Sequence, residues 1–317
     1  MPTARWAIGI DLGGTNLRVA RVDQDGEVAA LRSERVAPGR ESQLDRIHAL
    51  IRELAGSHAS DHGAVSGIGI GVAGRVRQCD GQVLTAGFLD LAGVPLGEML
   101  EEQHGVPVVV DNDAHMAMFG ELQIGAARGC QHAVMFTIGT GIGGAVVTDG
   151  SIYYGHGIAG QLGHLAVESS DRLCRCGRFG CIETYSSGAV LNSLIAEAGL
   201  EPDVRADTLL AMARSGDQVA AGVLRRWATP LATAIDSVMA ALDPELVVLG
   251  GGLGHIATEA LESIPLGSDW FGRPVVDAQL GDRAGVIGAA LKAIATAAPH
   301  RQRAVIGTGS RGATSST

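Results

Sequence analysis

The fold is decided by two similar stretches of sequence, I-G-I-D-L-G-G-T-N-L-R-V-A at residues 8–20 and M-F-T-I-G-T-G-I-G-G-A-V-V at residues 135–147. Each stretch is a strand, a glycine turn and a second strand, which predicts a β-hairpin. Hairpins commonly carry glycine for turn geometry alone. Two such hairpins, with a third glycine cluster at 250–252, instead favour two related α/β halves that offer their turns to one ligand.

The rest of the chain is predicted to alternate between strands and helices. We expect further strands at 27–35, 67–72, 106–110 and 246–250, and helices at 41–55, 114–124, 187–198, 206–214, 217–242 and 284–297. This order is typical of an α/β fold.

Composition limits the class of protein. A chain of 317 residues with 46% apolar content exceeds the size at which one core usually divides, so two domains are expected. The net charge of −10 argues against a nucleic-acid partner. No membrane-length apolar run or signal peptide is present, so we expect a cytoplasmic protein with no membrane partner. The Gly-, Ser- and Thr-rich tail at 304–317 is expected to be disordered.

The glycine turns have the chemistry of a phosphate site. Gly13 and Gly14 expose successive backbone N–H groups, and the Thr15 hydroxyl can donate to a phosphoryl oxygen. Asp11 cannot hold a phosphate itself, but it can serve Mg²⁺ on a nucleotide. The segment 137–144 repeats this arrangement with Thr140 as its hydroxyl. Neither segment is a Walker loop or a dinucleotide fingerprint.

Two carboxylates follow a predicted buried strand in V-V-V-D-N-D-A-H at 108–115. Phosphoryl transfer to a hydroxyl needs a positioned base, and Asp111 and Asp113 are both candidates. Capping of the following helix is an alternative role for Asp113. Their spacing alone does not choose between them.

An ordered set of motifs resembles the ROK family (repressors, open reading frames and sugar kinases) of the actin-like ATPase superfamily. The set comprises D-L-G-G-T-N, D-N-D-A, T-I-G-T-G-I-G-G, G-Q-L-G-H, C-R-C-G-R-F-G-C-I-E and D-P-E-L-V-V-L-G-G-G, and the match runs from about residue 6 to residue 297. Among family members the chain looks most like glucokinases and N-acetylhexosamine kinases.

The resemblance implies two ribonuclease H-like domains with Mg-ATP in the cleft between them. They would comprise residues 1–112 with about 284–300, and residues 113–283 with a zinc loop at 164–181. The implied nucleotide contacts are Asp11, Gly13, Gly14, Thr15, Asn16, Gly139, Thr140, Gly141, Gly143, Gly250, Gly251 and Gly252, of which the last three approach the adenosine.

The resemblance also selects Asp113 as the base and implies phosphorylation of a hexose, at its 6-hydroxyl. The implied sugar contacts are Gly74, Arg75, Asn112, Asp113, Gln161, His164 and Glu183. Three places depart from the family pattern. His115 replaces an Asn, Gln161 replaces a Glu, and T-A-G-F-L-D-L at 85–91 stands where related kinases often have Asn-Leu and then Trp. A neutral Gln weakens a charge-assisted bond to a hydroxyl, so we hypothesise that the acceptor is not simply glucose.

Cysteine spacing predicts a metal site. His164, Cys174, Cys176 and Cys181 supply four ligands suited to tetrahedral, structural Zn²⁺, and the family match favours this over a reactive thiol cluster. Cys79 and Cys130 are isolated and are interpreted as small apolar filler.

Two other functions compete with that of a sugar kinase. A sugar-responsive repressor would carry a winged helix-turn-helix before the first phosphate motif, and Asp11 lies too near the first residue for one. A sugar-binding regulatory protein or pseudokinase is favoured only by Gln161. The resemblance further suggests a homodimer.

Overall fold

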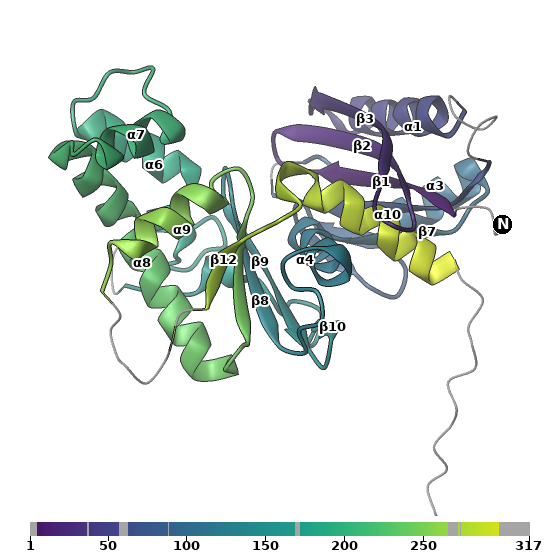
Figure 1. The fold of residues 1–317 in the computed structure, drawn as a ribbon. Coiled ribbons are helices and arrows are strands. Elements are labelled where there is room, and N and C mark those ends of the chain that lie inside the picture. Colours follow the sequence, from purple (N-terminus) through teal and green to yellow (C-terminus); the bar gives the residue numbers. More distant parts are fainter. Residues whose placement is uncertain are drawn as a thin grey trace, which may run out of the picture.

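The computed structural model describes residues 5–36, 38–56, 63–87, 89–168, 172–265, 272 and 274–297. It is an α/β structure with two five-stranded mixed sheets that lie side by side, each with its own helices (Figure 1). The predicted α/β class is confirmed. The tail expected to be disordered, 304–317, lies outside the described residues.

The first sheet has the strand order β3-β2-β1-β4-β7. Its strands are β1 (Trp6–Leu12), β2 (Asn16–Asp23), β3 (Val28–Arg35), β4 (Val65–Val72) and β7 (Val108–Asn112). β1, β2 and β3 are antiparallel, whereas β1, β4 and β7 are parallel. The carboxyl ends of the three parallel strands therefore meet at one edge.

The second sheet repeats this topology in the order β10-β9-β8-β11-β12. Its strands are β8 (Ala133–Ile138), β9 (Ile142–Thr148), β10 (Ser151–Ile152), β11 (Leu246–Gly250) and β12 (Val275–Asp277). Three antiparallel strands again lead into a parallel set. The repetition confirms the two related halves. A small ladder of β5 (Arg75–Arg77) and β6 (Gln82–Thr85) adjoins the first sheet.

The helices divide between the two sheets. Those of the first half are α1 (Arg40–Gly56) and α3 (Leu96–His104). Those of the second half are α5 (Glu183–Ser186), α6 (Gly188–Glu197), α7 (Ala206–Arg214), α8 (Gln218–Leu242) and α9 (Gly254–Glu262), and Trp227 of α8 is fully buried in the second core. Short 3₁₀ turns are η1 (Leu162–His164) and η2 (Gly281–Arg283).

Two further helices, α4 (Asp113–Ile124) and α10 (Ala284–Ala297), pack together between the sheets (Figure 1). Glycines permit this packing. A Cβ on Gly9 would lie 1.9 Å from the Val286 carbonyl oxygen, and one on Gly288 would lie 1.8 Å from the Met116 carbonyl oxygen. Backbone therefore meets backbone, and the start of α4 is held against the first sheet.

Side chains of α4 pack on both halves. Met118 packs with Met135 of the second sheet, whereas Phe119 packs with α10. The predicted division at residue 112 stays a prediction, and residues 298–300 of that division lie outside the described residues. Within the described residues, no helix is both long and apolar enough to cross a membrane.

Candidate active site

The site lies where the parallel strands of the first sheet end. Strand register aligns Asp11 with Gly71, and Gly71 with Asp111. A Cβ on Gly71 would lie 3.1 Å from the Asp113 Cα, so the absence of a side chain there lets α4 begin beside the sheet edge. Asp11 and Asp113 lie near enough for each charge to act on the other.

Asp11 is the carboxylate of the first glycine turn. Burial and the neighbouring Asp113 raise its pKa to about 6. Its Oδ2 lies 3.4 Å from Arg18, whose guanidinium also lies 3.4 Å from Asp282. Sequence reasoning missed Arg18, although it lies opposite Asp11 in the hairpin register. The Arg18 guanidinium thus lies beside the first glycine turn, in addition to the backbone N–H groups of that turn.

The first turn itself is closed by a hydrogen bond from the Gly13 N–H to the Asn16 carbonyl oxygen, at 3.0 Å. The side chains of Thr15 and Asn16 are exposed next to it. Both are therefore accessible to a ligand, as their predicted roles require.

The second and third glycine clusters meet at one edge of the second sheet. β8 and β11 are parallel, with Gly250 opposite Thr137, and the Leu253 N–H donates to the Ile138 carbonyl oxygen at 3.0 Å. Gly251 has a φ of 76°, and a Cβ there would lie 2.5 Å from the Ile138 carbonyl oxygen. A Cβ on Gly139 or Gly252 would meet no atom of the described residues within 4 Å. Of the predicted nucleotide glycines, Gly139 and Gly252 therefore border open space, whereas Gly251 packs on β8.

Glu183 lies against the second turn. Its Oε2 accepts a hydrogen bond of 3.0 Å from the Ile142 N–H, and a Cβ on Gly141 would lie 2.4 Å from that oxygen. A Cβ on Gly143 would lie 3.2 Å from the Ala114 Cβ, which brings the second hairpin to the first turn of α4. Glu183, a predicted sugar residue, therefore contacts the second glycine turn, and that turn lies against the start of α4.

Asp111 and Asp113 occupy different environments. The strand reaches Asn112, two residues beyond the predicted end, because β7 stays paired with β4 through Val72. Asp111 is therefore a fully buried strand residue, with Lys292, His115 and Tyr154 around its carboxylate. Burial acts to raise its pKa, but the His115 hydrogen bond and the Lys292 charge outweigh it and hold the pKa below its ordinary range.

Asp113 is the first residue of α4 and is partly exposed. Burial raises its pKa, and the hydrogen bond of 2.9 Å from the Ala114 N–H opposes that shift only in part. Asp113 is therefore the more accessible of the two carboxyls and the one whose pKa is raised, a contrast that was not available from spacing.

Capping of α4 belongs to Asn112 rather than to Asp113. Its Oδ1 accepts from the Ala114 and His115 N–H groups at 3.0 and 3.2 Å, and its Nδ2 donates to the Gly74 carbonyl oxygen at 3.0 Å. The helix starts one residue earlier than predicted, because a side-chain acceptor at Asn112 satisfies its first N–H groups. Gly74 is thereby fixed beside the start of α4.

The remaining predicted sugar residues lie on the loop before and within η1 and at the start of β5. Arg75 is exposed, while Gln161 and His164 are partly exposed. A Cβ on Gly163 would lie 1.9 Å from the Ile142 carbonyl oxygen, so η1 packs directly on β9 next to the second glycine turn.

The four predicted metal ligands come together. The ligand atoms of His164, Cys174, Cys176 and Cys181 all lie within 4.8 Å of one another. His164 Nδ1 lies 3.5 Å from Cys174 Sγ, and the sulfurs of Cys176 and Cys181 lie 3.6 Å apart. Three thiols and one imidazole in this space fit tetrahedral zinc. Burial raises the pKa of the Cys181 thiol to about 12, so zinc binding displaces its proton.

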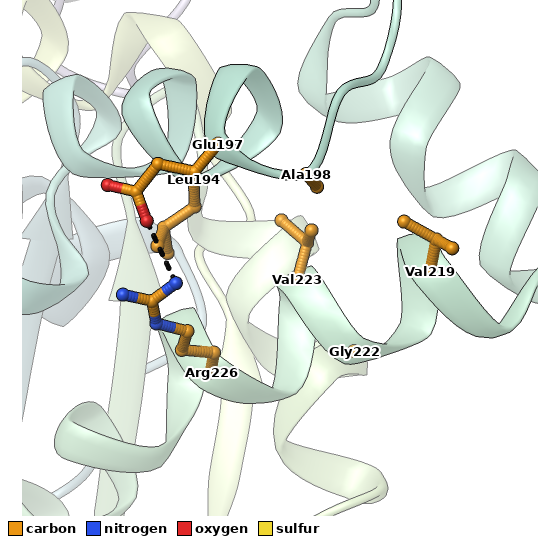
Figure 2. A pocket seen from close by; sticks show the side chains of 7 residues that line it. All are labelled: Leu194, Glu197, Ala198, Val219, Gly222, Val223 and Arg226. Carbon is orange, nitrogen blue, oxygen red and sulfur yellow. Dashed lines mark hydrogen bonds and ion pairs between the residues drawn. The ribbon is translucent and has the colours of Figure 1, made fainter.

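Two surface cavities lie away from these turns. One, of 310 Å³, is a groove between α6 and α8 in which Arg226 is directed at Glu197 at a distance of 2.9 Å (Figure 2). It lies at the carboxyl end of α6, whereas Gly188, at the amino end, donates to the Gly139 carbonyl oxygen of the second turn. The other, of 670 Å³, is bordered by Gln78 and Lys292 on the first half.

Two halves of one topology, with glycine turns and carboxylates at the strand ends, define an α/β protein of the ribonuclease H-like class. Comparison with known proteins gives the family: residues 7–296 match the ROK family, and the chain belongs to it.

Its relatives include sugar kinases. The glucokinase of Streptomyces coelicolor is 31% identical over 310 residues, covering 89% of this chain and 96% of the relative. The N-acetylmannosamine kinase of Shigella boydii is 33% identical over 257 residues, covering 78% of this chain and 83% of the relative. A crystal structure of a ROK family glucokinase from Streptomyces griseus, in complex with glucose and AMPPNP, matches with a TM-score of 0.79 and 30% identity, covering 92% and 99% of the two chains.

Proposed function

We propose that this protein is an ATP-dependent sugar kinase that transfers a phosphoryl group to a hexose or hexose derivative, at the 6-hydroxyl, with Asp113 as general base. One observation carries the proposal beyond the family. Of the two carboxylates after β7, Asp111 is buried and neutralised by partners, whereas Asp113 is partly exposed and has a raised pKa.

In the reaction, Asp113 accepts the proton of the sugar hydroxyl while that oxygen attacks the γ-phosphorus and ADP leaves. A positioned base contributes roughly 10²–10⁴-fold in rate. A base with a raised pKa takes up the proton more readily than an ordinary carboxylate, and this suits Asp113 to the step.

The nucleotide would be held at the three glycine clusters. Backbone N–H groups of residues 14–16 and 140–141 would donate to phosphoryl oxygens, because those of Gly13 and Gly139 already close their own turns, and residues 250–252 would lie beside the adenosine. Mg²⁺ would neutralise phosphate charge during transfer. Asp11 would hold this ion, directly or through water, and Arg18 would then exchange Asp11 for a phosphoryl oxygen.

The sugar would lie between Asp113 and the loop at η1, with contacts from Gly74, Arg75, Asn112, Gln161, His164 and Glu183. His164 would serve both sites, because its Nδ1 lies toward the cysteines and leaves Nε2 for a hydroxyl. Zinc would be structural, since four protein ligands leave no open position for a reacting water. We further propose that the enzyme acts in the cytoplasm, where ATP is available, and as a homodimer.

The test is a panel of hexoses and N-acetylhexosamines in an ATP-dependent, ADP-release assay. We expect turnover with at least one sugar, and a preferred acceptor other than glucose, because Gln161 lacks the family's carboxylate charge. The matched variant Gln161→Glu should shift preference toward glucose by a few-fold. Glucose as much the best substrate of the unaltered protein would defeat the acceptor hypothesis.

A sugar-binding regulatory protein is the second candidate, and Gln161 is the feature that favours it. Sugar-dependent stabilisation without ADP release for any sugar in the panel would support this candidate and contradict the kinase.

A further inference from the structure

The carboxylate that the proposed chemistry does not use, Asp111, is the centre of a buried polar cluster. We name Asp111, His115, Tyr154 and Lys292 the junction cluster. Its members come from four places in the fold: the end of β7, the first turn of α4, the loop after β10, and α10. The cluster therefore joins the first sheet, both central helices and a loop of the second half.

Asp111 satisfies donors on both of its oxygens. Oδ1 accepts from His115 Nδ1 at 3.0 Å and from Gln78 at 2.8 Å. Oδ2 accepts from the Tyr154 hydroxyl at 2.7 Å and from the Lys292 ammonium. With Asp111 fully buried, the pairing with Lys292 offsets the cost of its charge.

His115 makes a second contact that reaches the other half. Its Nε2 lies 3.2 Å from the Ala159 carbonyl oxygen, and its ring packs edge-on against Tyr154 with centroids 5.3 Å apart. A Cβ on Gly160 would lie 3.1 Å from His115 Nε2, so loop and imidazole are in close contact.

Tyr154 and Ala159 are the two ends of one compact turn. The Tyr154 carbonyl oxygen accepts from the Gly157 and Ala159 N–H groups at 2.8 and 3.2 Å. Gln161 follows two residues later and leads directly into η1 with His164. Holding both ends of this turn therefore fixes the approach to Gln161.

We propose that His115 is a positioning residue. Together with Tyr154 it holds the loop that leads to Gln161 against the end of β7, directly before Asp113. The inference rests on the proposed function for its kinetic consequence. An Asn at position 115, as in the family pattern, retains a donor for Asp111 but is too short to reach the Ala159 carbonyl oxygen as well. The sugar-binding part of the proposed site in this chain thus depends on a contact that an Asn does not make.

The test is steady-state kinetics of His115→Asn and Tyr154→Phe. Each variant removes one link to the loop, so we expect the KM for the sugar to rise about three- to tenfold, with the KM for ATP changed less than about twofold. The double variant should raise it by less than the product of the single effects, because both links hold the same turn. The matched control is Tyr153→Phe, since Tyr153 is the neighbouring, half-exposed tyrosine.

Hydrogen–deuterium exchange gives a readout that needs no activity. The amides of Gly157, Ala159 and Leu162 should exchange faster in His115→Asn and Tyr154→Phe than in Tyr153→Phe. If no sugar is phosphorylated, the proposed function fails, and hydrogen–deuterium exchange alone tests whether His115 and Tyr154 position the loop. If His115→Asn does not fold, Tyr154→Phe decides it. An unchanged sugar KM with unchanged exchange in the folded variants, or equal rises in both KM values, would overturn the inference.

Discussion

Asp111 and Asp113 stand two residues apart, yet the fold gives them opposite environments. The Asp111 region is a closed network in which a carboxylate is surrounded by donors, and its pKa is held below the ordinary range. The Asp113 region is a helix start at the sheet edge, beside Asp11, where burial raises the pKa of both carboxyls. Partners thus lower the proton affinity of the Asp111 carboxylate, whereas burial raises that of the Asp113 carboxylate.

The difference teaches that role follows environment rather than residue type. A paired, buried charge costs stability when its partner is removed. An under-paired carboxyl at an accessible edge is a candidate acid or base.

The largest expected effect is on stability at Asp111. Asp111→Asn leaves Lys292 with no carboxylate at this position, and removal of one partner of a buried pair costs roughly 3–5 kcal/mol. Denaturant unfolding of Asp111→Asn against the unaltered protein measures this. Asp113→Asn is the matched control and should change the free energy of unfolding by less than about 1 kcal/mol. Equal losses in the two variants would erase the contrast.

Removal of zinc should weaken the use of the sugar but not that of ATP. The cluster at His164 and Cys174 holds the loop that carries Gln161 and Glu183, so we expect the KM for the sugar to rise roughly ten- to a hundredfold. The KM for ATP should stay nearly constant. The measurement is kinetics of chelated protein whose metal content is verified, with zinc added back as control. Full activity in zinc-free protein would contradict a role for the metal in this loop.

Affinity for Mg-ATP should fall in acid, through Asp11. Its pKa of about 6 means that the metal-binding, ionised form is complete above that pH and is lost below it. Between pH 7 and pH 5 we expect up to a tenfold loss of affinity, the change in the ionised fraction of such a group. Binding titrations of the unaltered protein and of Asp11→Asn separate this from protonation of ATP itself. An identical pH dependence in both proteins would show that Asp11 does not bind the ion.

Much of this architecture was predictable from the sequence. Glycine turns between strands have a local cause, and their prediction is confirmed. The four predicted zinc ligands follow from residue type and spacing, and the structure brings them together, whereas the zinc ion itself stays a prediction. The exact ends of the strands and helices were harder to predict from the sequence. β7 runs through Asn112 because of pairing with β4, which no local pattern records.

The long-range contacts could not have been predicted in this way. Lys292 reaches Asp111 from a helix 181 residues away in sequence, and Tyr154 reaches it from the other half. Nothing in the periodicity of α10 distinguishes this lysine from one on a solvated face. The contact of Arg18 with Asp11 was easier to predict than these, because the register of the hairpin places the two residues opposite each other. The roles of individual sugar and nucleotide contacts stay predictions.

The central claim is that Asp113, and not Asp111, takes the proton. It is tested most directly by single-turnover phosphorylation of the best sugar by Asp113→Asn with both substrates saturating, beside isothermal titration of sugar binding. We predict that the rate falls by roughly 10²–10⁴-fold while sugar affinity changes by less than about threefold. A rate within tenfold of the unaltered protein, with the substrates bound, would contradict the account.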